Sequence, residues 1–543
     1  MHEIITPFFS VIFLIAAGLP ACGGGNGEAN DQDAAIDGGV ADGEVDGGED
    51  PDAFVEPRPS IEMEFFREAA GEILLPDVRV VATIFDAENE PWDGDVSQVS
   101  IVAENPQGIF DPDTSGVEVL GEGRYSVVVS SPQSGEVRIE ASAVVEGETA
   151  TAEVTVVFLT MLSPEWSIPR SLDEINTDGQ EDSIAVSPDG NTLFFSYSPL
   201  VGCPALPTDE WTSECMEAAG PYQEPERPCV YGVDENGFVT EGLYGNSEEP
   251  PGGWPFTKGV YNSYAAHRDS EGRFSKLDCL GFEDDGVIME VSPTSGPENP
   301  VVGESYTLFF AYPDWLDFFG DGYHGTVFTY VAVTAGEHAN FGGPVTSWGI
   351  MPPNMKAAML TGPINDDLQM ENRGIGEYRV YLDPEDSNHY IYLPATDTTD
   401  ASNWLVKTSE LLGDYPQGDW GNMVALPLPI NTPDQNEIFP WPVTIERDGV
   451  LVKELFFNRG PQEAFSAPTQ VLYSRWENET WMEPVTVMET DHSFGLGTVF
   501  ILALPAVADR GDHVEMFFVY SILTQLSPEI RWNHQIAVSR TLK

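Results

Sequence analysis

Basic side chains are scarce in this 543-residue chain. It has 23 lysine and arginine residues against 90 aspartate and glutamate residues, which gives a formal net charge of -67. Binding to nucleic acid needs clustered lysine and arginine, so we exclude a nucleic-acid partner. The same charge disfavours docking on anionic lipid headgroups, whereas it permits divalent cations and basic partners.

Long hydrophobic runs are also missing. The most apolar segment, residues 8–19, is too short to cross a hydrocarbon core of about 30 Å as a helix. It is followed by Ala21 and Cys22, and we therefore expect residues 1–21 to be a signal peptide. An ordinary secretory signal that is cleaved near Ala21 is the alternative.

The segment around Cys22 resembles the signal of bacterial lipoproteins, in which a short hydrophobic stretch and a small residue precede a cysteine. The resemblance implies that Cys22 receives the lipid and that acyl chains hold the exported chain on a membrane. Gly23 stands where an aspartate in enterobacterial lipoproteins favours retention in the inner membrane. The resemblance therefore predicts a location at the outer membrane or the cell surface.

Common catalytic motifs are absent from the sequence. It has no G-x-S-x-G, H-E-x-x-H, Walker or dinucleotide-binding glycine pattern, and no two of its eight histidines have i, i+4 spacing. We therefore predict neither a catalytic residue set nor a resident cofactor. Calcium is the alternative, because Asp-Gly pairs recur in residues 22–57, although they lack the spacing of an EF-hand loop.

Cysteine is rare as well, with five residues in the whole chain. Besides Cys22, an even number remains, which in an exported protein predicts two disulfides with three alternative pairings among Cys203, Cys215, Cys229 and Cys279. No two of them have the C-x₂₋₄-C spacing of a zinc site, which disfavours the rival zinc interpretation.

Residues 22–57 are dominated by glycine, alanine, aspartate and glutamate. Such a segment has too little apolar surface to offset the entropy of ordering, so we expect it to be disordered. Its like charges extend it. We interpret it as an acidic tether that lifts the folded part off the membrane.

The next block, residues 58–158, is rich in strand patterns and has no helix signal. Alternating or continuous apolar residues predict strands at 78–84, 97–102, 125–130, 135–142 and 150–158. Short strands of this density favour a β-sandwich. The phrase from Gly121 to Ser126 and the valine-rich last strand resemble the immunoglobulin-like domains of bacterial surface proteins. The resemblance implies a spacer, with adhesion through the loops as the alternative.

Residues 159–543 contain an internal repeat. Its clearest copy is 175–195, and residues 430–458 repeat it, with weaker copies elsewhere. Each unit joins an apolar strand to an aromatic strand by a polar turn. In the turn Ser-Pro-Asp-Gly at 187–190, proline fixes φ, aspartate bonds its own backbone and glycine supplies a positive φ.

This turn and its flanking strands are similar to the WD40-like repeat of the periplasmic propeller in the Tol-Pal system. Four short strands per unit are typical of a propeller blade, and five detected units predict five blades. A sixth blade in the long first interval is the alternative. The predicted fold class is therefore all-β, with an immunoglobulin-like β-sandwich at 58–158 and a five- or six-bladed β-propeller at 159–543.

The first interval is long because of an insertion at about 199–259, which is rich in proline and glycine. It is too small for a large core, so we expect disulfides to staple it, with Cys279 on the following blade as one partner. Long loops on rigid scaffolds often carry binding, and specificity in this insertion is one hypothesis. A purely structural loop is the other.

Two further segments supply candidate ligand-binding residues. One mixes carboxylates with aromatic side chains, as sugar and cation sites do, and contributes Asp314, Trp315, Asp317, Asp321 and His324. An exposed loop between blades is the alternative interpretation of it. The other is Asp383, because Tyr381-Leu-Asp383-Pro384 resembles the Asp-Pro strand of five-bladed glycoside hydrolases of the arabinanase and xylosidase type. Those enzymes use a general acid and a general base from separate blades.

These patterns favour a lipid-anchored, non-catalytic binding module whose propeller recognises a protein, a peptide or a glycan of the cell envelope. A five-bladed-propeller glycoside hydrolase is the alternative enzyme class, and a structural surface spacer is the third. A pair of carboxylates about 5–10 Å apart in one funnel would favour the hydrolase.

Overall fold

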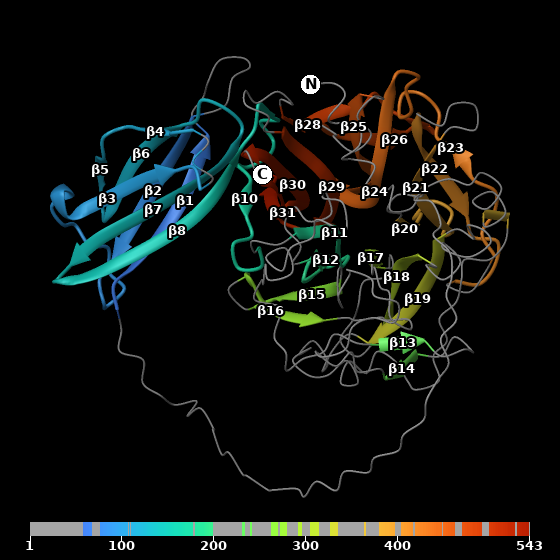
Figure 1. Ribbon diagram of the computed structural model, residues 1–543, viewed down its shortest axis with the longest axis horizontal. Helices are drawn as coiled ribbons and strands as arrows, with labels where there is room; N and C mark the ends of the chain where they lie inside the picture. Colours follow the sequence, from blue (N-terminus) through green and yellow to red (C-terminus); the bar gives the residue numbers. More distant parts are fainter. Residues whose placement is uncertain are drawn as a thin grey trace, which may run out of the picture.

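The computed structural model shows an all-β chain (Figure 1), which confirms the predicted fold class at that level. Its named elements are strands β1 to β31 and one 3₁₀ turn, η1 (Val96–Gln98). The structure describes residues 58–67, 77–106, 108, 110–176, 180–198, 231–233, 239–241, 262–269, 272–279, 291–295, 305–313, 326–334, 363–364, 379–396, 403–415, 419–447, 449–461, 470–490, 499–526 and 529–541.

Two antiparallel sheets form the N-terminal sheet pair, residues 58–158. One sheet contains β1 (Ser60–Arg67), β2 (Val78–Phe85), β4 (Asp113–Thr114), β5 (Glu118–Gly121) and β6 (Arg124–Ser130). The other contains β3 (Val99–Glu104), β7 (Gly135–Val145) and β8 (Glu148–Phe158). Buried and less buried residues alternate along β7, as expected of a strand with one face on a core. Four of the five strand segments predicted from the sequence are confirmed. The fifth, 97–102, is a strand only from Val99 on, because its first two residues lie in η1.

Five further groups of antiparallel strands follow, and we describe each group as a sheet. Their strands, sheet by sheet, are β11 (Gln180–Val186), β12 (Thr192–Ser198), β15 (Asn262–Arg268) and β16 (Phe274–Cys279); β17 (Val291–Ser295), β18 (Ser305–Pro313) and β19 (Thr326–Thr334); β20 (Arg379–Leu382), β21 (His389–Thr396), β22 (Trp404–Glu410) and β23 (Val424–Ala425); β24 (Gln435–Arg447), β25 (Val450–Pro461), β26 (Gln470–Glu477), β27 (Thr480–Trp481) and β28 (Val485–Glu489); β29 (Val499–Asp509), β30 (Val514–Leu526) and β31 (Glu529–Arg540). The first strands of these sheets contact one another in the order β11, β17, β20, β24, β29 and back to β11. We call this closed arrangement the ring. The first and the last group are joined by one parallel bridge, and they share a continuous sheet with the β3, β7 and β8 group.

Three of the first strands contain a residue other than glycine with positive φ. These residues are Ser183 (55°), Phe439 (53°) and Leu504 (58°). At each one the register with the second strand shifts, as in a β-bulge. Residues with side chains rarely adopt this conformation, so the flanking ladders must hold it. Each bulge immediately precedes the part of the strand that lines the cavity described below.

The two clearest copies of the sequence repeat each contribute an asparagine that makes hydrogen bonds to the backbone of another sheet. The Ile536 N–H donates to Oδ1 of Asn176 and the Asn176 amide donates back to the Ile536 carbonyl, both at 2.8 Å. Asn431 makes the same pair of bonds with Val406, at 2.8 and 2.9 Å. Each asparagine therefore binds the third strand of the preceding sheet and satisfies backbone groups that packing has buried.

The turn predicted at 187–190 is confirmed in its mechanism. Gly190 has a φ of 70°, and its N–H donates to the Ser187 carbonyl at 2.8 Å. The Asp189 carboxylate accepts from the backbone N–H of Asn191 at 3.0 Å. The positive φ favours glycine at position 190, and a Cβ atom there would also push the Arg510 side chain aside.

The sheet pair is packed against the ring over a shared core (Figure 1). The short strands β9 (Met161–Leu162) and β10 (Arg170–Ser171) add to β28 and β31 of the ring, and β10 also pairs with β8. Across this junction the Tyr520 hydroxyl donates to the buried Glu136 carboxylate at 2.5 Å. Burial raises the pKa of Tyr520, so it stays a donor.

Several predicted segments lie outside the described residues. They include the signal peptide at 1–21 and the acidic tether at 22–57. Of the predicted insertion at about 199–259, the structure describes the hairpin of β13 (Tyr231–Val233) and β14 (Val239–Glu241). Within the described ranges no helix has the length and hydrophobicity needed to cross a membrane.

Candidate functional site

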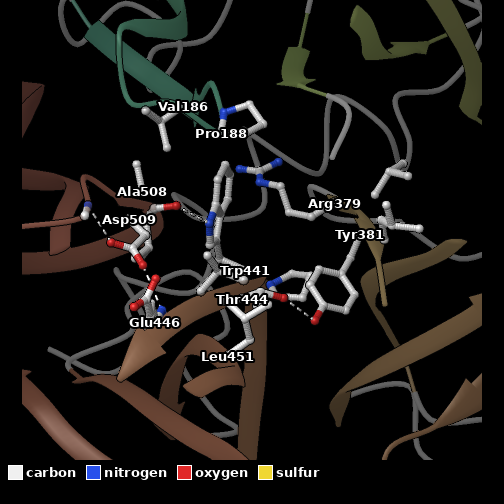
Figure 2. Close-up of a pocket in the computed structure, with 16 residues that line it drawn as sticks. Val186, Pro188, Arg379, Tyr381, Trp441, Thr444, Glu446, Leu451, Ala508 and Asp509 are labelled. Carbon is white, nitrogen blue, oxygen red and sulfur yellow. Dashed lines mark hydrogen bonds between the residues drawn. The ribbon is translucent and has the colours of Figure 1, made fainter. Parts of the chain in front are cut away.

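A cavity of about 430 Å³ lies where the first strands of four ring sheets converge (Figure 2). Strand β11 contributes Val186, β20 contributes Arg379 to Leu382, β24 contributes Trp441 to Thr444, and β29 contributes Val507 to Asp509. In β11, β24 and β29 the lining residues follow the bulge of their own strand, whereas β20 pairs with β21 without a register shift. Most of its lining residues are apolar or aromatic, and polar atoms contribute about as much of the exposed lining of the cavity as apolar atoms do.

Trp441 forms the centre of the lining. Its indole N–H donates to the Val507 carbonyl at 2.9 Å, which ties β24 to β29. The Arg379 guanidinium lies over the Trp441 ring, 4.8 Å from its centroid, and donates to the Ile184 carbonyl at 2.6 Å. Arg379 is only 4% exposed, so its guanidinium is held in the wall of the cavity and does not extend into the mouth.

Tyr381 forms one wall together with Thr444. Their hydroxyls lie 2.8 Å apart and share a hydrogen bond between β20 and β24. Burial is the main reason that the pKa of Tyr381 is raised, and the Thr444 bond opposes this effect. The phenol is therefore neutral at physiological pH, and it supplies a ring face and a hydrogen bond rather than a charge.

The mouth of the cavity combines carboxylates with exposed apolar side chains. The Asp509 carboxylate accepts from the backbone N–H groups of Glu446 and Gly511, each at 2.8 Å. The Glu446 side chain is exposed. Leu382 and Leu451 also line the cavity, although they are 37% and 63% exposed. Figure 2 shows Glu446 and Asp509 together on one side of Trp441 and Tyr381 on the other.

A second cluster lies behind Tyr381. The Lys453 ammonium pairs with the Asp383 carboxylate, and both side chains are nearly buried. The ammonium lies 5.4–5.7 Å from the ring centroids of Tyr381, Tyr390, Trp476 and Trp481. We call this group the lysine cage. Four aromatic faces and one carboxylate are the environment in which cation–π attraction is strong.

The structure therefore places the predicted ligand residue Asp383 in the turn after β20. One of its oxygens pairs with Lys453, and the other accepts the Glu385 backbone N–H at 2.9 Å. Its side chain is turned into the lysine cage, and it is not among the residues that line the cavity. Its role in ligand binding stays a prediction.

The other predicted site residues fall outside what the structure describes. This holds for the lipidation residue, for the candidate segment and for most of the disulfide candidates, namely Cys22, Cys203, Cys215, Cys229, Asp314, Trp315, Asp317, Asp321 and His324. Cys279 is the last residue of β16. Among the described residues, no group of three or more histidine, cysteine, aspartate or glutamate side chains is arranged to hold a metal ion.

The residues that line the cavity were not predicted from the sequence. A usable signal was present, because Arg379 begins an otherwise apolar strand two residues before Tyr381, and a lone cation in such a strand must be paired when buried. Trp441 lies between two prolines in a strand, which also marks an unusual position. Neither signal reveals that the two side chains meet.

No family model and no curated protein matches this chain. Among solved structures, it is similar to a glycoside hydrolase (10% identity, 67% of this chain and 88% of that chain, TM-score 0.35). It is also similar to an α-L-arabinofuranosidase from Lactobacillus brevis (9%, 66% and 90%, TM-score 0.36) and an inulosucrase from Halalkalicoccus jeotgali bound to kestose (8%, 70% and 90%, TM-score 0.30). Likeness this distant identifies no family.

Proposed function

We propose that the ring is a five-bladed β-propeller fused to an immunoglobulin-like sandwich, and that the protein is a non-catalytic binding module of the cell envelope. The observation that carries the binding function is the cavity of about 430 Å³ at the centre of the ring. The cyclic contact of five first strands supports the blade count. The propeller would hold its ligand in the cavity between blades one, three, four and five.

The pairing of the polar lining groups favours binding over catalysis. Trp441, Tyr381 and Asp509 each use their polar atoms in bonds within the protein. A glycoside hydrolase needs one carboxyl as acid and a second as base or nucleophile, both facing the substrate. Of the residues described around the cavity, Glu446 and Asp509 are the carboxylates, and Asp509 caps a turn.

The sandwich would contribute more than distance from the membrane. It shares a hydrophobic core with the ring and supplies Glu136 to the junction. We therefore propose that it fixes the orientation of the propeller relative to the anchor at Cys22. Export, lipidation of Cys22 and a location at the outer membrane or cell surface are part of the same proposal, supported by the signal-like sequence before Cys22.

The test is a screen of the purified full chain against a glycan array, chromogenic glycosides and envelope peptides, with and without calcium. A cavity ligand must lose affinity in Leu451→Lys and keep it in Val450→Lys. The two positions are neighbours and are 63% and 62% exposed, but only Leu451 lines the cavity. Turnover that Glu446→Gln abolishes would instead establish the hydrolase. Ligand binding that is equal in both lysine variants would refute the cavity as the site.

A further inference from the structure

We propose that the cavity receives a basic segment of a partner polypeptide, with an aliphatic side chain inserted and lysine or arginine side chains on the rim. This inference rests on the proposed binding function and names its ligand class. The inference rests on two features at one end of the ring: apolar side chains in the wall of the cavity, and exposed carboxylates around its mouth.

The interior suits an aliphatic or long-stemmed side chain. Trp441, Val443 and Leu451 offer apolar surface, and the polar atoms of Trp441 and Tyr381 are already bonded within the protein. A ligand rich in hydroxyl groups, such as a sugar ring, would leave part of its hydroxyl groups against the apolar side chains of this wall. Burying such groups without partners is costly.

The rim suits positive charge. The cavity lies at the ends of β11, β20, β24 and β29, so the hairpins that follow these strands surround its mouth. Glu446 lines the mouth and is exposed, and the β20–β21 hairpin carries the exposed Glu385 and Asp386. Glu446 at the mouth, with Glu385 and Asp386 on the adjacent hairpin, complements an ammonium or guanidinium group whose stem packs below.

The cations of the same hairpins are engaged in contacts within the protein. Arg447 pairs with Glu454 at 3.1 Å, and Arg510 lies 3.8 Å from Glu515 and donates to the Asp189 carbonyl. Arg379 is buried against Trp441. Little positive charge is therefore presented to an incoming ligand.

The whole-chain charge acts in the same direction. With 90 acidic and 23 basic residues, the protein attracts cationic partners and repels anionic ones during the diffusional encounter. Salt screens this field beyond about 8 Å at physiological ionic strength, so the rim carboxylates decide the bound state. An acidic polysaccharide is disfavoured on both counts.

The lysine cage shows that this part of the fold accommodates an ammonium group. Lys453 is held by the Asp383 carboxylate and four aromatic rings, and one of them, Tyr381, also lines the cavity. The chain thus already places a lysine stem along apolar surface next to the proposed site. The ligand would repeat that arrangement on the cavity side of Tyr381.

The experiment measures fluorescence anisotropy of short labelled peptides with the purified full chain at physiological salt. The probes alternate leucine with lysine, leucine with glutamate, and glycine with lysine. We expect the leucine–lysine peptide to bind most tightly, because it alone supplies both the apolar and the charged contact. Leu451→Lys should weaken it about tenfold or more, the equivalent of one apolar side-chain contact. Val450→Lys carries the same charge change outside the cavity and should weaken it less than about twofold.

The outcomes separate this inference from the proposed function. A leucine–glutamate peptide or a neutral glycan that binds more tightly, and loses affinity in Leu451→Lys, would overturn the basic-ligand inference and leave the binding function intact. Equal binding of the leucine–lysine and glycine–lysine peptides would show that charge alone acts, and would overturn it as well. Loss of affinity that is equal in Leu451→Lys and Val450→Lys would remove the cavity as the site and overturn both.

Discussion

The sheet pair and the ring are both all-β, yet they bury charge differently. Within the described part of the sheet pair, Glu136 is the buried charged residue, and it faces the ring. The described ring buries many more, including Glu181, Arg379, Asp383, Lys407, Glu437, Glu454 and Glu515. Two sheets that face one another can close over apolar side chains alone, whereas adjoining sheets of a ring need a defined offset at every seam.

Directional bonds supply that offset. Asn176 and Asn431 fix neighbouring sheets through backbone groups, and Glu515 on β30 pairs with Arg268 on β15 of the neighbouring sheet. Apolar contacts tolerate small slips, but a hydrogen bond or buried ion pair does not. The ring should therefore be far more sensitive than the sheet pair to loss of a single polar side chain.

Glu515→Ala should have the largest effect. The Glu515 carboxylate binds Arg268 and Arg540, each at 2.8 Å, and it is 1% exposed. Its removal leaves buried guanidinium charge uncompensated, which costs about 3–5 kcal/mol. Urea unfolding followed by tryptophan fluorescence measures the loss. Glu153→Ala is the matched control in the sheet pair, because its pair with Arg138 at 2.7 Å is 43% exposed and should contribute about 0–1 kcal/mol. Equal losses would abolish the contrast between the two regions.

Lys453→Met should come next, with a loss of about 3 kcal/mol. The substitution keeps the stem in the lysine cage and leaves the Asp383 carboxylate buried without its partner. Adding Asp383→Asn removes that stranded charge, so the double variant should regain more than half of the loss. Thermal unfolding of the three variants measures this coupling. Additive losses would mean that the ammonium and the carboxylate are independent.

Asn431→Ala tests the seam asparagines and should cost about 2 kcal/mol. It leaves the Val406 N–H and carbonyl buried without their side-chain partner. The exposed Asn422 is the control, and Asn422→Ala should change the free energy of unfolding by less than about 0.5 kcal/mol. Urea midpoints measured side by side decide the matter. If Asn431→Ala leaves the free energy of unfolding unchanged, water or a shifted backbone replaces the two hydrogen bonds to Val406.

The comparison also explains which parts were predictable from sequence. Strands such as 78–84 and the turn at 187–190 depend on local pattern, and both were found. The partner of Asn176 lies 360 residues away at Ile536, and no local pattern encodes that pairing. The cavity is missed for the same reason. Arg379, Trp441 and Val507 come from three sheets, and only the closure of the ring brings them together.

The weakest expected effect lies at His389, on the outer part of the ring. Its imidazole stacks on Tyr415 at 3.9 Å, and burial lowers its pKa below the usual 6.5. The folded state therefore prefers the neutral imidazole. This preference stabilises the fold fully above pH 6.5, and the stabilisation is lost as the pH falls from 6.5 toward the lowered pKa. His389→Phe keeps the stack without a titrating group, so its melting temperature should fall less between pH 7 and pH 5 than that of the unmodified chain. If the melting temperatures of His389→Phe and the unmodified chain fall equally between pH 7 and pH 5, protonation of His389 is not linked to folding.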